Sequence, residues 1–139
     1  AAWISDTPVT RTNLLYDTVN SINWAAGTQF YPGDSDVRVN LQFAAVNLID
    51  ASNVLDRTDI YNFNGSIFSK FANNRWQSNT RFFIDLDENG VYFNPEISFI
   101  GWEPQEIYAA WHYFSGDEQT IGGFWKDNSL LTLGWRGRF

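Results

Sequence analysis

The stretch LLTLGWRGRF, residues 130–139, indicates the fold of the chain most directly. Its residues alternate between an apolar set and a polar or small set. The first set comprises Leu131, Leu133, Trp135 and Phe139, with Gly137 among them, and the second comprises Thr132, Gly134, Arg136 and Arg138. Because side chains along a β-strand point alternately to opposite faces, this pattern predicts a strand with one apolar face and one cationic, hydroxylated face.

The same ten residues resemble the C-terminal targeting signal of outer-membrane β-barrel proteins. The likeness consists of Phe139 at the end, apolar residues at alternate positions before it, and Gly134 as the sixth residue from the end. It implies a targeting signal formed by Leu133, Gly134, Trp135, Gly137 and Phe139 and read by the outer-membrane assembly machinery. It also implies a transmembrane barrel in contact with membrane lipid in the bacterial outer membrane.

Length and composition limit the remaining possibilities. The 139 residues suit one domain, and the absence of cysteine excludes disulfides, thiolate metal sites and cysteine nucleophiles. A net charge of −7 argues against binding nucleic acid, which needs a basic surface. Aromatic residues form 18% of the chain, an excess that aromatic girdles of a membrane barrel or the core of a ligand-binding β-clam would explain. No apolar run approaches the ~20 residues of a transmembrane helix.

Alternation between apolar and polar residues recurs along most of the chain. Strands are predicted at residues 37–49, 60–71, 75–86, 91–102, 106–115 and 130–139, with a further one at 22–31. A first strand is placed near residues 9–19, although the spacing within residues 9–23 also fits a helix. The sequence therefore predicts an all-β, antiparallel up-and-down transmembrane β-barrel of eight strands, with residues 1–139 as its single domain.

The predicted connections alternate in length in the way expected of such a barrel. Residues 32–36, 72–74 and 103–105 form compact turns, whereas residues 50–59 and 116–129 form long loops. Bacterial barrels have short turns on the periplasmic side, so a periplasmic C-terminus places the long loops outside. The short turn at residues 87–90 departs from this pattern. Pro95 removes a ladder donor inside residues 91–102, which predicts a β-bulge there or a later start of the strand.

Charged residues of the strands fall mainly on the polar faces. This predicts a luminal charged network made of Arg38, Lys70, Arg75, Arg81, Asp85, Glu96, Glu106, His112, Arg136 and Arg138. An eight-stranded barrel is only wide enough for side chains to fill it, so these charges would pair into an ionic plug. A wider barrel, built from several copies or with a partner chain, would instead leave a cation-lined path for small anions. Pairing residue 86 with residue 91 across the turn places Arg81 opposite Glu96 as an ion pair.

The alternation of apolar and polar residues does not by itself distinguish a membrane barrel from a soluble β-barrel that encloses a small apolar ligand. The aromatic residues favour the membrane, because they fall into two belts near the strand ends, as membrane interfaces prefer. One belt comprises Phe30, Phe71, Trp76 and Phe139, and the other comprises Tyr61, Phe93, Trp111 and Tyr113. The resulting hypothesis is an outer-membrane barrel with a structural, adhesive or weakly pore-forming, porin-like role.

Two motifs raise the question of further chemistry. Residues 85–90 (DLDENG) followed by Glu96 match the calcium-loop pattern, but strands flank them, and a hairpin turn selects Asp, Asn and Gly for its own reasons. His112, with Ser115 and Glu118, resembles the His-Ser-Glu sets of lipid A deacylases, although opposite parities separate His112 from Ser115. The sequence therefore predicts no metal, cofactor or catalytic residue, and a membrane-embedded lipid-modifying enzyme stays an alternative.

Overall fold

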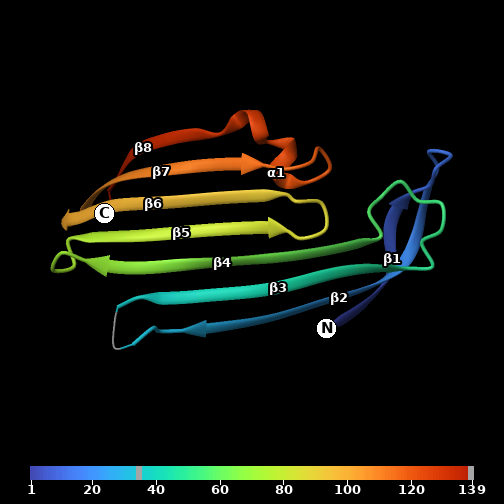
Figure 1. The fold of residues 1–139 in the computed structure, drawn as a ribbon, viewed down its shortest axis with the longest axis horizontal. Helices are drawn as coiled ribbons and strands as arrows, with labels where there is room; N and C mark the ends of the chain where they lie inside the picture. Colours follow the sequence, from blue (N-terminus) through green and yellow to red (C-terminus); the bar gives the residue numbers. More distant parts are fainter. Residues whose placement is uncertain (34–35, 138–139) are drawn as a thin grey trace.

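The computed structural model describes residues 1–33 and 36–137 and contains eight β-strands in one sheet. The strands are β1 (Ala2–Thr10), β2 (Tyr16–Phe30), β3 (Arg38–Ile49), β4 (Asp59–Phe71), β5 (Trp76–Asp85), β6 (Val91–Trp102), β7 (Gln105–Ser115) and β8 (Leu130–Gly137). Each strand pairs antiparallel with the next along the chain, which confirms the predicted all-β, up-and-down topology. Helix α1 (Ile121–Phe124) and a 3-10 turn, η1 (Lys126–Asn128), lie in the β7–β8 connection (Figure 1). Neither helical segment of the described chain is long and apolar enough to cross a membrane.

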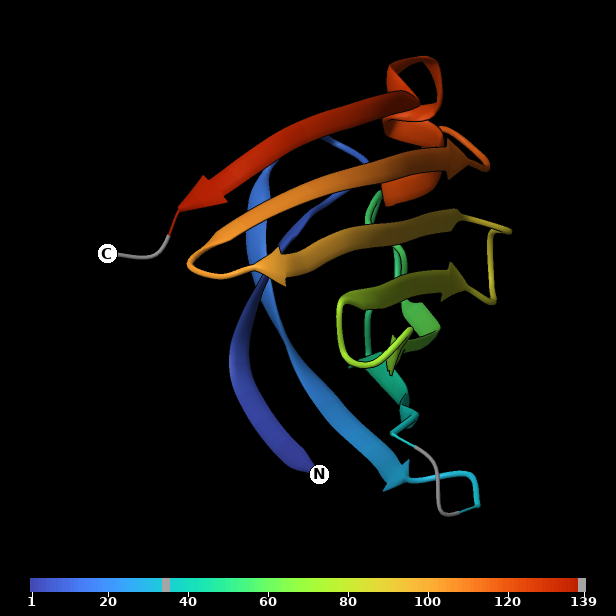
Figure 2. The ribbon, with the colours of Figure 1, turned by 90° about the vertical axis from the view of Figure 1, so that its left-hand side faces the viewer.

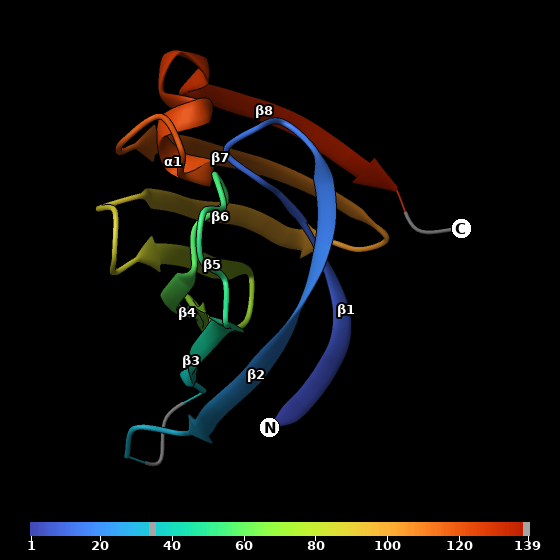
Figure 3. The same cartoon turned by 90° about the vertical axis from the view of Figure 1, so that its right-hand side faces the viewer.

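The sheet is strongly curled. Figures 2 and 3 show β3 to β8 forming a curved wall, while β1 and β2 bend back toward the side of β8. Among the described residues, each strand pairs only with its neighbours in the chain, so β1 and β8 are the two edges of the sheet. The curl gives the sheet a concave face, on which the site residues discussed below converge, and a convex face.

The long connections lie together at one end of the sheet. Residues 50–58 and 116–129 connect strands at this end, together with the short connections 11–15 and 86–90, and residues 31–37, 72–75 and 103–104 connect strands at the other (Figure 1). The predicted gathering of the two long loops at one end is therefore confirmed, and the short turn after β5 lies at that end as well. We call these the long-loop end and the short-turn end.

The predicted position of the first strand is wrong. β1 ends at Thr10 and β2 begins at Tyr16, so residues 16–30 form a strand, and residues 11–15 form a turn in which Leu14 has a φ of 64°. The side chain of Arg11 fixes this turn, because it donates to Asp17 and to the carbonyl of Ser52 in the β3–β4 loop. Residues 11–15 (RTNLL) carry no clear turn signal, and the contacts of Arg11 with distant residues leave no local pattern in the sequence.

The two faces of the sheet differ in polarity. The largest fully buried side chains of the described residues are polar, and they lie on the concave side: Ser21, Asn94 and Ser98. The buried apolar residues are few and small: Val9, Val19, Ala45 and Ala110. The convex face instead exposes large apolar side chains, which include Trp24, Ile67, Phe71, Trp76, Ile97, Ile107, Trp111, Leu131, Leu133 and Trp135. This arrangement is the reverse of a sheet that packs its apolar face inward and turns its polar face to water.

Pro95 is accommodated with neither the β-bulge nor the later strand start that the sequence predicts, because β6 already begins at Val91. Phe93 pairs with Tyr113 and Glu96 pairs with Ala110, so the β6–β7 register continues unchanged and places Pro95 opposite Trp111. Proline has no N–H for the ladder, and the side chain of Asn94 donates to the Trp111 carbonyl at 3.0 Å. The neighbouring carboxamide thus supplies a donor where the backbone lacks one. The only shift of register in this pair lies between Phe99 and Trp102.

Gly134 on β8 makes room for Tyr108 on β7. The two residues lie opposite each other, and a Cβ on Gly134 would overlap the phenol ring of Tyr108. The Cζ atom of Arg136 lies 3.9 Å from the centroid of the same ring. The glycine therefore lets an aromatic ring approach the backbone of an edge strand and support a cation.

We expect Gly134→Ala to destabilise the chain by about 1–2 kcal/mol, because the ring of Tyr108 must rotate away, and overpacking has costs of this order. Denaturant titration followed by circular dichroism measures the effect. In a Tyr108→Ala background the same substitution should have little effect, since the clash is gone. An equal cost in both backgrounds would show that Tyr108 does not press against Gly134.

Candidate functional site

An ion-pair network on the concave face joins the last three strands. Arg136 of β8 donates through Nη1 and Nη2 to the two carboxylate oxygens of Glu96 on β6, both at 3.0 Å. Its Nη1 also donates to Oε1 of Glu106 on β7 at 3.1 Å. The side chains of Glu96 and Glu106 are 9% and 7% exposed, whereas that of Arg136 is 42% exposed. Two buried carboxylates therefore depend on one guanidinium that reaches water.

Strand β5 adds weaker contacts to this network. The carboxamide of Gln77 donates to Oε1 of Glu106 at 3.2 Å. Arg81 is 52% exposed, and its Nη2 lies 4.0 Å from Oε2 of Glu96, beyond hydrogen-bond distance. Arg136, rather than Arg81, is thus the main partner of Glu96.

The predicted register, with Arg81 directly opposite Glu96, is wrong, although the two side chains do form an ion pair at 4.0 Å. In the structure Arg81 pairs with Asn94, and Glu96 pairs with Asn79. The hairpin closes with a hydrogen bond from the Asp85 amide to the Gly90 carbonyl at 2.6 Å, so residues 85 and 90 form the first pair. The prediction began from residues 86 and 91, and this change of turn moves every partner by two residues.

A second cluster lies at the long-loop end and centres on Arg57 of the β3–β4 loop. Its Nη1 and Nη2 donate to the two carboxylate oxygens of Asp85 at 2.6 and 2.8 Å. The carboxylates of Asp87 and Glu88 lie 3.3 and 3.4 Å from the same guanidinium. The hydrogen bonds to Asp85 raise the pKa of Arg57 above its ordinary value, so Arg57 stays charged. The cluster ties the β3–β4 loop to the β5–β6 turn.

The sequence analysis missed Arg57. This residue lies outside the strands, where parity says nothing about direction, and its partners follow it by 28 to 31 residues in the chain. The available signal was a lone cation in a stretch that also holds Asp50, Asp56 and Asp59. Only the folding of the loop over the turn reveals which carboxylate it binds.

We expect Arg57→Gln to destabilise the chain by about 2 kcal/mol, less than the usual cost of breaking a buried ion pair. The loss is limited because Asp85 keeps two backbone donors, the amides of Asp87 and Glu88. Lys126→Gln is the matched control, since Lys126 pairs at 3.9 Å with the exposed Glu118 and should contribute little. A denaturant titration that gives equal effects for the two variants would contradict this role of Arg57.

The remaining cations of the predicted network lie apart from both clusters. The Cζ atom of Arg38 lies 5.3 Å from the centroid of the Phe68 ring. Lys70 and Arg75 are exposed near the β4–β5 turn, and within the described residues neither forms an ion pair. Arg138, together with Phe139 of the predicted targeting signal, lies outside the described residues. The predicted network is thus two ion-pair clusters and several separate cations.

His112 belongs to a third group on the concave face, which contains Tyr92 and Asn94. Its Nδ1 lies 3.1 Å from the Tyr92 hydroxyl and 3.4 Å from the side-chain nitrogen of Asn94. The ring of Tyr92 stacks on His112, with 6.3 Å between the centroids. Glu118 pairs with Lys126 instead and is 90% exposed. The structure therefore gives His112 partners other than the acid of the His-Ser-Glu set.

The residues of the calcium-loop pattern do not converge. Asp85 is bound by Arg57 and Glu96 by Arg136, so the first and last acids of the pattern belong to separate ion-pair clusters. Across residues 1–33 and 36–137, no group of three or more His, Cys, Asp or Glu side chains is placed to hold a metal ion. The pattern in this chain describes a hairpin turn.

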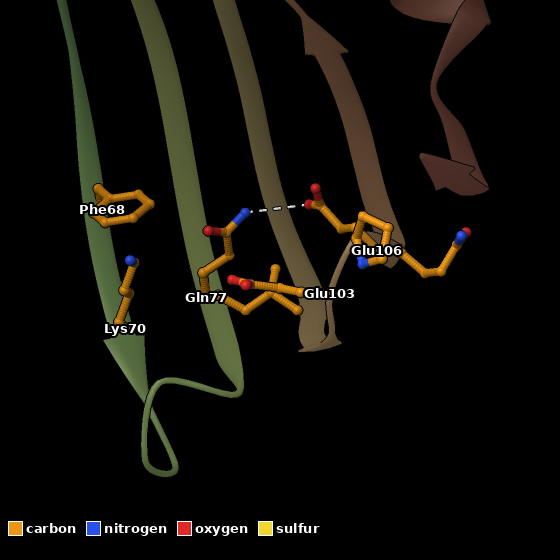
Figure 4. Close-up of a pocket in the computed structure, with 8 residues that line it drawn as sticks. Phe68, Lys70, Gln77, Glu103 and Glu106 are labelled. Carbon is orange, nitrogen blue, oxygen red and sulfur yellow. Dashed lines mark hydrogen bonds between the residues drawn. The ribbon is translucent and has the colours of Figure 1, made fainter. Parts of the chain in front are cut away.

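Two hollows open between these groups. One, of about 430 Å³, is lined by Phe68, Lys70, Gln77, Ile100 and residues 103–106 (Figure 4). Figure 4 shows Gln77 and Glu106 joined by their hydrogen bond, with Lys70 and Phe68 on β4 to one side. The other, of about 520 Å³, lies along β2 to β5 and includes Gln42 and Arg81 in its lining. This part of the sheet is therefore open rather than filled by side chains.

The chain matches none of the protein families, curated proteins or solved structures with which it was compared. Its function is therefore inferred from the topology, the polarity of the two faces and the charged clusters.

Proposed function

We propose that the chain forms the wall of a β-barrel in the bacterial outer membrane, with its convex face against lipid and its concave face toward a lumen. Its role in this proposal is structural or weakly pore-forming. The antiparallel topology and the gathering of long connections at one end support the proposal. The terminal strand supports it as well, because Leu131, Leu133 and Trp135 are exposed on the convex face.

The observation that carries the proposal is the inverted polarity of the sheet. Leu133 is 74% exposed and Trp135 is 59% exposed, while the carboxylates of Glu96 and Glu106 are buried. Leaving a large apolar side chain in water forgoes roughly 1.5–3 kcal/mol of burial free energy, and burying a charge is unfavourable unless it is paired. Against lipid, the same apolar side chains lie in a medium that suits them, and the polar groups face one another or luminal water.

Aromatic contacts on the convex face also support a membrane position. One row follows the short-turn end through Phe71, Trp76, Phe99 and Trp102, with successive ring centroids 5.0 to 6.4 Å apart. A second row runs through Trp24 and Phe43 and reaches the long-loop end at Tyr61. Aromatic residues gather at both interfaces of membrane barrels. The proposal therefore includes an aromatic girdle.

The two alternatives have less support from the geometry. A soluble barrel for an apolar ligand needs an apolar interior, whereas the central part of the concave face carries Glu96, Ser98 and Arg136. A lipid-modifying enzyme based on His112 needs an acid or nucleophile beside the ring. The polar partners of His112 in the structure are Tyr92 and Asn94.

Flotation with phosphatidylcholine vesicles tests the proposal. Refolded protein is expected to float with the vesicles and to need detergent for solubility in their absence. Brominated lipids should quench the fluorescence of the convex-face tryptophans, which include Trp76, Trp111 and Trp135. Folded, monodisperse protein that stays in detergent-free buffer and is not quenched would refute the membrane assignment.

A further inference from the structure

We propose that the concave face of β3 to β5 binds a small, hydroxyl-bearing oxyanion through Arg38, Lys70 and Arg81. The proposal rests on the proposed function, because it names the class of solute that the lumen would hold. Its basis is the difference between acids that are neutralised within the chain and cations that are not.

The acids of the concave face are already paired. Asp85, Glu96 and Glu106 are the acidic residues on the concave positions of β3 to β8 among the described residues. Arg57 binds the first, and Arg136 binds the other two. These carboxylates are buried beneath their partners, so they offer little to a cation that enters from solvent.

Three cations on the same face have no carboxylate within hydrogen-bond distance among the described residues. Arg38, Lys70 and Arg81 lie on three adjacent strands, and all three are exposed. Within the described chain, Arg38 and Lys70 form no ion pair, whereas Arg81 has a 4.0 Å contact with Glu96 and lies 3.3 Å from the carboxamide of Asn79. Adjacent strands are about 4.8 Å apart and residues rise about 3.3 Å along a strand, so the three backbone positions spread over about 10 Å across the strands and about 13 Å along them, between the levels of Ser66 and Lys70 on β4. We call these three residues the cation strip.

The hollow beside Arg81 identifies the kind of anion. On the concave positions its polar lining is neutral or cationic and consists of Gln29, Asn40, Gln42, Asn64, Ser66 and Arg81, so that Arg81 is the member of the cation strip that lines it. A guanidinium binds a carboxylate or phosphate through paired hydrogen bonds, and carboxamides both donate to and accept from hydroxyl groups. An oxyanion with neighbouring hydroxyls matches both features. A cavity lined by one sign of charge also concentrates ions of the opposite sign.

The net charge of −7 does not oppose this inference, because most acids of the chain lie in loops, turns and strand ends. Screening limits the reach of those exposed charges to about 10 Å at moderate salt. The cation strip acts at contact distance. Local charge on the concave face therefore decides which ion binds there.

The test is a titration with gluconate, followed by NMR of the arginine Nε–Hε signals of the refolded protein in micelles. Signals of Arg38 and Arg81 are expected to shift and saturate, while those of Arg57 and Arg136 stay fixed, since carboxylates already occupy them. Acetate at equal ionic strength should bind about tenfold more weakly, because it lacks the hydroxyls that the carboxamides would bind.

Substitutions sharpen this experiment. Arg38→Gln with Arg81→Gln should weaken gluconate binding at least tenfold, whereas Lys126→Gln should leave it unchanged. Unshifted Arg57 and Arg136 signals report that the double variant is folded. A uniform, non-saturating shift of all arginines, no shift, or equal affinity for acetate would overturn the proposal. Gluconate binding is measured in micelles and membrane association is measured by vesicle flotation, so either proposal can fail without the other.

Discussion

Arg136→Gln is expected to destabilise the chain by about 3–4 kcal/mol, because it leaves two neighbouring carboxylates buried without a counter-charge. Glu96 and Glu106 both lose their strongest hydrogen bonds, and only the weak contacts with Arg81 and Gln77 stay. The cation–π contact between Arg136 and the ring of Tyr108 is lost at the same time. Denaturant titration in micelles, followed by circular dichroism, measures the change.

The side chain of Arg136 is much more exposed than that of Glu96, so removing the acid should destabilise the chain less than removing the cation. The variant of Glu96 therefore serves as the control. Glu96→Gln should cost less, about 1–2 kcal/mol, because the freed guanidinium is 42% exposed and still binds Glu106. The triple variant Arg136→Gln, Glu96→Gln, Glu106→Gln should recover most of the loss, since no buried charge is left. If Glu96→Gln were as damaging as Arg136→Gln, the guanidinium would have no access to water, and the interior would be a closed ionic plug.

Leu41→Arg is expected to destabilise the membrane-inserted chain by roughly 2–4 kcal/mol, the cost of an arginine on the lipid face near the bilayer midplane. Leu41 lies on the convex face of β3, opposite Gly65 and beside its backbone. In the proposed orientation, the new guanidinium would lie in the hydrocarbon core of the bilayer. It would have to bend toward the membrane surface or draw water into the hydrocarbon core. Refolding into vesicles at increasing denaturant gives the free energy of unfolding for wild type and variant.

Gln42→Arg is the matched control, because it lies next to Leu41 on the same strand but on the concave face, where it is exposed. It should change stability by less than ~1 kcal/mol, as exposed substitutions usually do. Leu41→Met separates the effect of charge from the loss of leucine packing. Equal, small effects for both arginine variants would place water on both faces of β3 and refute the lipid contact.

Much of the fold was predictable from alternation alone. The bodies of β3 to β8, the gathering of the two long loops at one end and the shared face of residues such as Glu96 and Arg136 all follow from the two-residue period of a strand. A period of two identifies faces reliably, because a shift of two residues leaves the face unchanged. The same property explains the wrong partner for Arg81, since Asn94 and Glu96 lie on one face and differ only in register.

Other parts of the site depend on contacts that no local pattern encodes. Arg57 binds Asp85 because the β3–β4 loop folds over the β5–β6 turn. The side chain of Asn94 donates to the carbonyl of Trp111 because Pro95 has no N–H to donate there. The turn at residues 11–15 is likewise held by Arg11 through a residue in another loop. Each of these contacts joins segments whose separation in sequence gives no hint of their distance in space.

The sequence by itself determined that this chain is an antiparallel sheet with one apolar and one polar face, because alternation is a local property of extended backbone. Tertiary structure alone decided which face is concave and which charges are paired. Curvature turns the polar face inward and brings Glu96, Glu106 and Arg136 together from three strands. It leaves Arg38, Lys70 and Arg81 without strong partners, because pairing depends on register and distance across strands rather than on parity.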